Sequence, residues 1–155
     1  MLRPSVPLQP GVTCRVRALG GDARIADRLA QMGILPGMEI TVTRIGPLGN
    51  PLELSMPGGQ ALALRAEEAE ALDCELVRLP LSLVPSGPPA WRITELRGGQ
   101  RFRARMRALG LVPGATLEVL GTRPLRLRDA RGNVVPLGRG EAARILVEPL
   151  ESAHD

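Results

Sequence analysis

The chain contains one pattern twice, and this duplication limits what the chain can fold into. Residues 15–37 read RVRALGGDARIADRLAQMGILPG, and residues 92–114 read RITELRGGQRFRARMRALGLVPG. Eight residues of the first copy recur, identical or similar, 77 positions later: Arg15, Val16, Leu19, Gly21, Arg28, Gly33, Pro36 and Gly37 match Arg92, Ile93, Leu96, Gly98, Arg105, Gly110, Pro113 and Gly114. Self-similarity at a fixed offset predicts one structural unit used twice.

The repeat also predicts the domain organisation. A length of 155 residues suits one ordinary domain or two small ones, and the duplication favours two. We expect a first domain over residues 1–79 and a second over residues 90–151. The stretch 80–89 between them should be a semi-rigid linker, because it is rich in proline. Its prolines are Pro80, Pro85, Pro88 and Pro89.

Each copy predicts the same order of elements: strand, helix, strand, hairpin, helical turn, strand. The helices are indicated by apolar residues on one helical face, followed by a glycine and, three residues later, a proline. Five short strands around a thin aliphatic core predict a small closed barrel, since closure removes exposed strand edges. The first core should contain Ile25, Leu29, Met32, Ile40, Val42, Leu54, Leu62 and Leu64. The second should contain Phe102, Met106, Leu109, Leu117, Val119, Leu127, Val135 and Leu137.

Composition narrows the classes of function. Trp91 and Phe102 are the only aromatic residues, so stacking on nucleic-acid bases is disfavoured. Residues 1–80 hold 8 Arg against 9 acidic residues, whereas residues 81–155 hold 12 Arg against 7. The basic second half indicates either an anionic partner or an ordinary solvated surface. No apolar run is long enough to span a membrane, and we expect a cytoplasmic location.

The chain lacks the residues of a catalytic or metal site. Its only histidine is His154, and no phosphate-binding loop or zinc-ligand spacing is present. We therefore expect no enzyme, no cofactor and no tightly bound metal. Cys14 and Cys74 fall on the first and last expected strands of one barrel, where they are either neighbours or two separately buried apolar side chains. The acidic cluster Glu67, Glu68 and Glu70 should be a solvated helix face.

The first copy resembles the FeoA domain, a small cytosolic component of bacterial ferrous iron uptake. Residues that match the family pattern cover about 70 positions. They are Leu8-Gln9-Pro10-Gly11, Arg28-Leu29, Met32-Gly33, Pro36-Gly37, Pro47-Leu48-Gly49, Pro51 and Leu62-Ala63-Leu64-Arg65. The second copy resembles the same domain less closely. It has Gly121-Thr-Arg-Pro-Leu125 in place of the Pro-Leu-Gly loop, and Gly138 follows Leu137 where the first copy has Arg65.

The resemblance implies two SH3-like barrels in tandem, mainly β, each with one short helix after its first strand. It also implies a non-enzymatic accessory protein that binds or regulates FeoB, a membrane-embedded iron permease with a cytosolic GTPase domain. Related barrels occur in iron-dependent repressors. A second hypothesis is therefore a regulatory module of a metal-dependent transcriptional regulator, or a protein that binds DNA directly. The Arg-rich segment 101–107 supports this hypothesis, whereas the absence of a helix-turn-helix weakens it.

The asymmetry between the copies predicts where a partner binds. Two prolines should hold the loop Pro47-Leu48-Gly49-Asn50-Pro51 in few conformations, which lowers the entropic cost of docking. We expect Pro47, Leu48, Gly49, Pro51 and Arg65 to contact the partner. Arg103 and Arg107 are the candidates in the second copy. The alternative is that the prolines only shape a hairpin and that Arg65 pairs with Glu68. The sequence leaves open whether the tandem replaces a homodimer of single domains.

Overall fold

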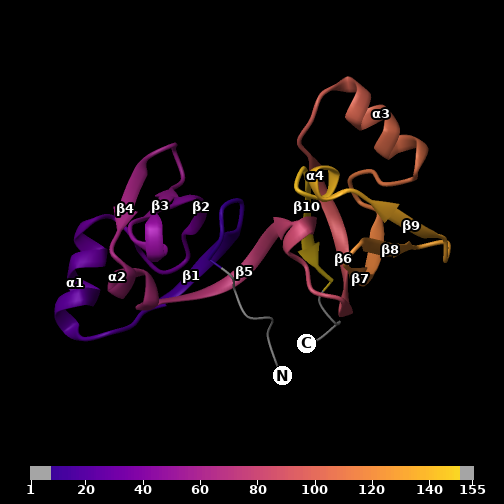
Figure 1. The fold of residues 1–155 in the computed structure, drawn as a ribbon. Helices are drawn as coiled ribbons and strands as arrows, with labels where there is room; N and C mark the ends of the chain where they lie inside the picture. The colour runs from indigo at the N-terminus through magenta and orange to yellow at the C-terminus, as the bar shows by residue number, and fades with distance from the viewer. Residues whose placement is uncertain (1–7, 151–155) are drawn as a thin grey trace. The chain divides into compact units, whose positions relative to one another are not determined.

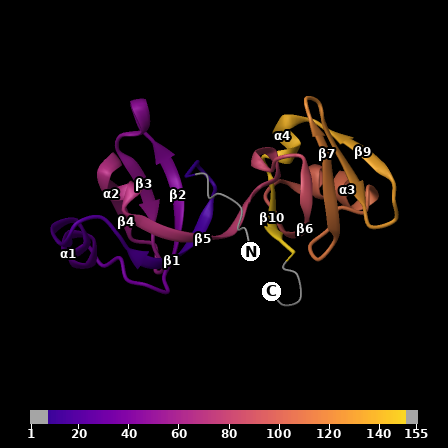
Figure 2. The same cartoon turned by 90° about the horizontal axis from the view of Figure 1, so that it is seen from below.

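A computed structural model describes residues 8–150, which divide after Val77 into two compact units. The first unit contains β1 (Thr13–Leu19), α1 (Ala23–Gln31), β2 (Glu39–Ile45), the 3-10 helix η1 (Pro47–Gly49), β3 (Leu52–Ser55), β4 (Ala61–Leu64), α2 (Ala66–Glu70) and most of β5 (Leu72–Pro80). In the views of Figures 1 and 2, α1 and α2 lie side by side at one end of this unit.

The second unit repeats this order of strands and α-helices. It contains η2 (Leu81–Leu83), β6 (Gly87–Leu96), α3 (Gln100–Ala108), β7 (Thr116–Thr122), β8 (Leu125–Asp129), β9 (Val134–Leu137), α4 (Arg139–Ala142) and β10 (Ile145–Pro149). The expected mainly β class and tandem arrangement are therefore confirmed.

The helices α1 and α3 both end where the sequence predicts. They differ from each other in the residue that caps their first turn. The Asp22 carboxylate caps α1 by accepting a hydrogen bond of 2.9 Å from the Ile25 amide. In contrast, Gly99 precedes α3 and supplies no side-chain cap. Both helices stop before a glycine in the left-handed region, Gly33 at φ 96° and Gly110 at φ 78°.

The strands of both units pair in the same register. In the first unit β2 pairs with β1 and β3, and β3 pairs with β4. In the second unit β7 pairs with β6 and β8, and β8 pairs with β9. Each unit has a β-bulge at the same place, at Thr43 between β2 and β3 and at Leu120 between β7 and β8. Bulges bend a strand, so the two sheets curve at equivalent points.

The sheet is not closed, contrary to the expected closed barrels. The hydrogen-bonded order runs β4-β3-β2-β1-β5-β10-β6-β7-β8-β9, which leaves β4 and β9 as edges. Each of these strands has four residues and leads into a helical turn, and the strand after that turn lies beside β1 or β6 instead of pairing with the free side. Shortness protects such an edge, and Pro136 within β9 removes one amide donor.

Aliphatic side chains fill both cores as expected, although five positions are only half-buried. The buried predicted residues are Leu29, Ile40, Val42, Leu54, Leu64, Met106, Leu117, Val119, Leu127, Val135 and Leu137. Those half-buried are Ile25, Met32, Leu62, Phe102 and Leu109. The sequence analysis missed Ile34 and Leu111, which are buried at equivalent positions after the helices. It also missed Trp91, which is buried at the position that Cys14 occupies in the first unit.

The stretch expected to be a linker is built into the second unit. Pro80 ends β5 and pairs with Leu146 of β10. Leu81 in η2 and Val84 after it are buried, and the last residues, 87–89, begin β6. Burial of these side chains holds the segment against the core of the second unit.

Candidate functional site

The loop between β2 and β3 is tied together by its own backbone. The Gly46 amide donates to the Pro51 carbonyl at 2.8 Å, and the Gly49 amide donates to the Gly46 carbonyl at 3.1 Å. A further bond of 3.2 Å joins the Asn50 amide to the Pro47 carbonyl. In Figure 2 this segment, η1, projects beyond the ends of β2 and β3. The loop is therefore a preformed protrusion.

Leu48 lies in this protrusion with its side chain in solvent. Its relative exposure is 103%, the highest among the exposed large apolar residues of the described chain. Its backbone is left-handed, with φ 58° and ψ 27°, a conformation that costs a non-glycine residue about 1–2 kcal/mol. Neither the exposure nor the conformation helps the fold. Backbone strain of this kind is often found at binding sites.

Gly46 closes the loop, a role that the sequence analysis missed. A Cβ at this position would lie 2.6 Å from the Asn50 oxygen and 2.8 Å from Cδ of Pro51. A glycine next to a Pro-x-Gly-x-Pro segment is a signal that could have indicated this close approach.

The equivalent connection of the second unit, between β7 and β8, forms no such protrusion. Thr122 pairs with Leu125 across a turn of two residues, Arg123 and Pro124. In the first unit Ile45 pairs with Leu52 across six residues. The difference noted in the sequence is therefore a difference in surface shape between the two units.

The strand register places Arg65 at the same end of the sheet as the Leu48 loop. Leu52, directly after Pro51, pairs with Leu64, directly before Arg65. The Arg65 residue is exposed. Its backbone amide, rather than its guanidinium, is the group that binds Glu68, with a distance of 2.9 Å to Oε1.

Glu68 is buried, contrary to the expected solvated helix face; its exposure is 2%. Arg28 on α1 explains this burial, since its Nη1 lies 3.2 Å from Oε2 of Glu68. The second unit repeats the pair: Arg105 on α3 binds Glu141 of α4, whose Oε1 also accepts the Gly138 amide at 3.2 Å. In both units an arginine of the long helix thus holds the helical turn. Glu67 and Glu70 are exposed, as expected.

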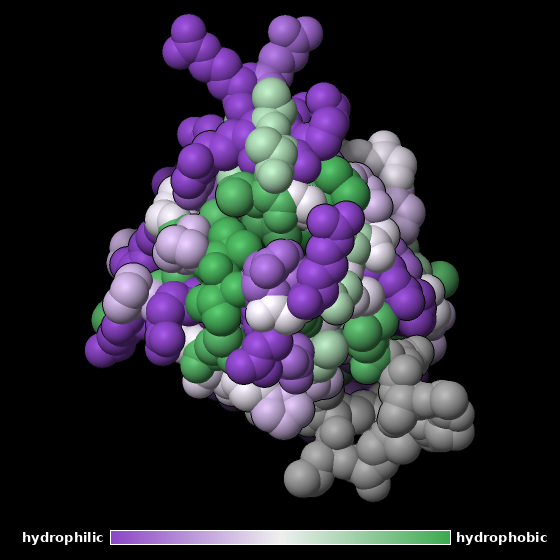
Figure 3. All heavy atoms as spheres, turned by 90° about the vertical axis from the view of Figure 1, so that its right-hand side faces the viewer, coloured by the Kyte–Doolittle hydropathy of each residue, from purple (hydrophilic) through white to green (hydrophobic). Residues whose placement is uncertain are grey.

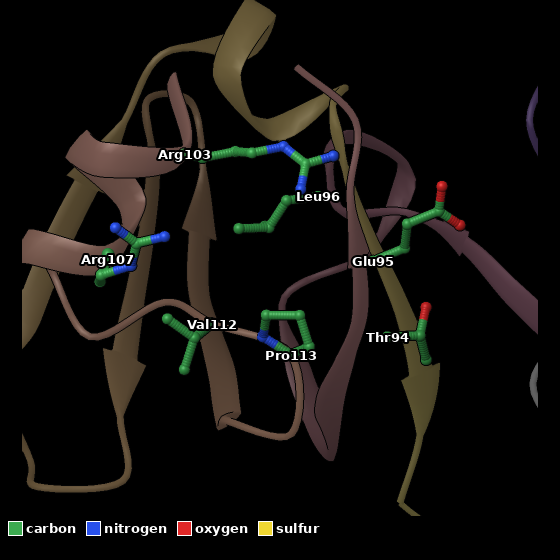
Figure 4. Close-up of a pocket in the computed structure, with 7 residues that line it drawn as sticks. All are labelled: Thr94, Glu95, Leu96, Arg103, Arg107, Val112 and Pro113. Atoms are coloured by element: carbon green, nitrogen blue, oxygen red, sulfur yellow. The ribbon is translucent and has the colours of Figure 1, made fainter. Parts of the chain in front are cut away.

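Arg103 and Arg107 line a hollow of about 350 Å³ in the second unit. Figure 4 shows Arg103 extending from α3 above Leu96, and Arg107 on the same helix at the side of Val112. Thr94 and Glu95 complete the lining. In Figure 3, which shows one face of the second unit, hydrophilic side chains border a band of apolar surface. The hollow likewise combines charged and polar side chains with apolar ones.

The two cysteines are neighbours in the first unit. They lie on the adjacent strands β1 and β5, and their side chains share a hydrogen bond. This bond and burial raise the pKa of the Cys14 thiol. The same bond lowers the pKa of Cys74, which is half-buried, whereas Cys14 is fully buried.

Comparison with known proteins decides the family. The FeoA domain matches the chain twice, over residues 7–76 and 79–149. The chain belongs to the FeoA family. The FeoA fold is SH3-like, as the resemblance implied, and the two matches cover nearly all of the described chain.

One solved structure is similar to this chain over nearly its whole length. The solution structure of iron(II) transport protein A from Clostridium thermocellum is 35% identical, with a TM-score of 0.55, and the alignment covers 94% of this chain and 87% of that one. The crystal structure of an iron uptake regulatory protein (FeoA) is 30% identical, with a TM-score of 0.44. That alignment covers 47% of this chain and 99% of the other. No curated protein matches the chain significantly.

Within residues 8–150 of this FeoA protein, no group of three or more His, Cys, Asp or Glu side chains is arranged to hold a metal ion. In the same range, no helix is both long and apolar enough to cross a membrane.

Proposed function

We propose that this FeoA-family protein is a non-enzymatic accessory protein of ferrous iron uptake that binds the cytosolic region of a FeoB GTPase-permease. Two FeoA domains and the likeness to an iron(II) transport protein support the iron uptake context. The protein would then lie in the cytoplasm, at the inner face of the plasma membrane through its partner.

The contact surface in this proposal is the Leu48 loop together with Arg65. The observation that carries it is the fully exposed, left-handed Leu48 on a loop closed by its own hydrogen bonds. A preformed apolar tip loses little conformational entropy on docking. Arg65 lies at the same end of the sheet and offers several donors to a carboxylate or carbonyl of the partner.

A binding measurement with the purified cytosolic region of FeoB tests the proposal. Leu48→Asp and Arg65→Ala should each weaken binding about tenfold or more, since residues at the centre of an interface contribute most. Leu48→Asn separates contact from strain, because asparagine tolerates the left-handed region: it should keep the fold and still weaken binding.

Val134→Asp is the matched control, since Val134 is 53% exposed on β9 of the second unit. It should bind like the wild type. Wild-type affinity of the folded Leu48 variants would refute this contact surface. A shift of duplex DNA by the wild-type protein at physiological salt would favour the regulatory hypothesis over transport.

A further inference from the structure

The hollow of the second unit joins two cationic side chains to an apolar floor. Arg103 and Arg107 are one helical turn apart on α3 and so face the same way. Below them lie Leu96, which is 6% exposed, and the half-buried Val112. Pro113 stiffens the turn that forms the remaining wall (Figure 4).

The charges of these two arginines are not neutralised within the described chain. Nε of Arg103 donates to the Gly98 carbonyl at 3.0 Å, which fixes the side chain and leaves both terminal nitrogens available. Among residues 8–150, the Arg107 side chain has no hydrogen bond or ion pair. Arg105 on the same helix is different, since Glu141 neutralises it.

Glu95, the one acid among the described residues that line the hollow, does not compensate these charges. The Glu95 carboxylate binds Arg97 at 3.1 Å and points away from both guanidinium groups in Figure 4. A ligand carboxylate would therefore meet two guanidinium groups with free donors. The adjacent apolar floor of the hollow could bind an apolar group of the same ligand.

The first unit has the same positions without the charges. At the repeat offset of 77, Arg103 and Arg107 correspond to Ala26 and Ala30. The apolar positions are kept, with Leu35 at the place of Val112 and Pro36 at the place of Pro113. The two arginines are therefore specific to the second unit, at positions next to apolar residues that both copies share.

We propose that this hollow binds a short acidic peptide segment of a protein partner, with a carboxylate held by Arg103 and Arg107 and an adjacent apolar side chain on Leu96, Val112 and Pro113. A volume of about 350 Å³ accommodates one or two side chains. A concave apolar floor suits a peptide better than a DNA backbone, which needs an extended row of cations. The inference does not depend on the Leu48 loop.

The test uses the full chain and a fluorescent peptide containing Leu-Asp-Glu-Leu. Fluorescence anisotropy should show saturable binding that Arg103→Ala with Arg107→Ala weakens about tenfold or more. Arg101→Ala is the matched control: it removes one exposed charge from the same helix outside the hollow and should leave affinity nearly unchanged. Trp91 fluorescence monitors folding of each variant, because Trp91 is buried in the second unit.

The reciprocal variant, Ala26→Arg with Ala30→Arg, should add a second binding site in the first unit. Several results would overturn the proposal. One is no saturable binding up to about 1 mM peptide, the limit of weak affinity. Another is an equal loss with Arg101→Ala, which would indicate diffuse charge attraction. A third is displacement of the peptide by duplex DNA at physiological salt with tighter affinity than the peptide itself.

Discussion

At the scale of single residues, the packing of Phe102 requires a glycine at position 98. Gly98 precedes α3 and lies under the ring of Phe102, and a Cβ at Gly98 would be 2.4 Å from a ring carbon. The adjacent Gly99 has open space, since a Cβ there would have nothing within 4 Å. Two neighbouring glycines therefore have different roles, one enforced by packing and one not.

Gly98→Ala should destabilise the second unit by about 1–3 kcal/mol, because overpacking forces the ring or the backbone to move. Gly99→Ala, the control, should change the free energy of unfolding much less. Urea unfolding followed by Trp91 fluorescence measures both. Equal effects of the two substitutions would contradict the packing explanation.

The cysteine pair gives a second prediction at this scale. Cys14 is buried and its pKa is raised, whereas the pKa of the half-buried Cys74 is lowered by the hydrogen bond from Cys14. Iodoacetamide should therefore modify Cys74 first in the native protein, at a lower pH than a free thiol, whose pKa is about 8.5. Cys14→Ala should move this pH profile back towards the ordinary value. Equal modification of both cysteines, detected by mass spectrometry, would argue against the assigned donor.

At the scale of elements, the same arginine–glutamate pair joins the long helix to the helical turn in both units. Arg28 holds Glu68, and Arg105 holds Glu141. The Arg that forms part of the family pattern in the first copy thus has a structural role. Burial differs between the copies, since the Glu68 side chain is 3% exposed and that of Glu141 is 28% exposed.

The pair in the second unit predicts a pH dependence of stability. The Arg105 guanidinium, helped by the Gly138 amide, lowers the pKa of Glu141. A lowered folded-state pKa stabilises the fold above the ordinary glutamate value of about 4.3, and this stabilisation is lost as pH falls through the lower folded value. Glu141→Gln should therefore reduce the dependence of stability on pH below about 4.3. Chemical unfolding followed by Trp91 fluorescence, from neutral to acidic pH, measures the free energy of unfolding at each pH. If its slope against pH were the same in Glu141→Gln as in the wild type, the contribution of Glu141 would be ruled out.

At the scale of the whole molecule, one unit is used twice with different surfaces. The first presents the Leu48 protrusion, and the second presents the hollow with Arg103 and Arg107. Duplication lets the surface of one copy change independently of the other, because each copy has its own aliphatic core. Arg103 and Arg107 are solvent-exposed, and substitutions at exposed positions cost little stability.

The whole chain should not bind a metal ion stoichiometrically. The chain has one histidine and two cysteines, so a complete ligand set for zinc or ferrous iron is lacking. Calorimetric titration with either ion under reducing conditions measures this. Saturable one-to-one binding at micromolar affinity would contradict the prediction, whereas weak association with the exposed Glu67 and Glu70 would not.

The sequence by itself determined the tandem, the order of elements and most core positions, because these depend on local spacing. Apolar periodicity and Gly–Pro signals act within a few residues of each other, and the first copy indicated how the second should be interpreted. The two prolines around Leu48 likewise predicted a restricted loop, since proline limits its own backbone.

Only the tertiary structure decided features that need groups from distant elements to meet. Glu68 is buried because Arg28, forty residues away in sequence, and the Arg65 amide converge on it. The sheet stays open because β5 and β10, which follow the helical turns after β4 and β9, lie beside β1 and β6 and not beside β4 and β9. The hollow at Arg103 and Arg107 forms because α3 and the turn after it lie against the end of β6. Such convergence depends on the path of the whole chain, which local spacing does not encode.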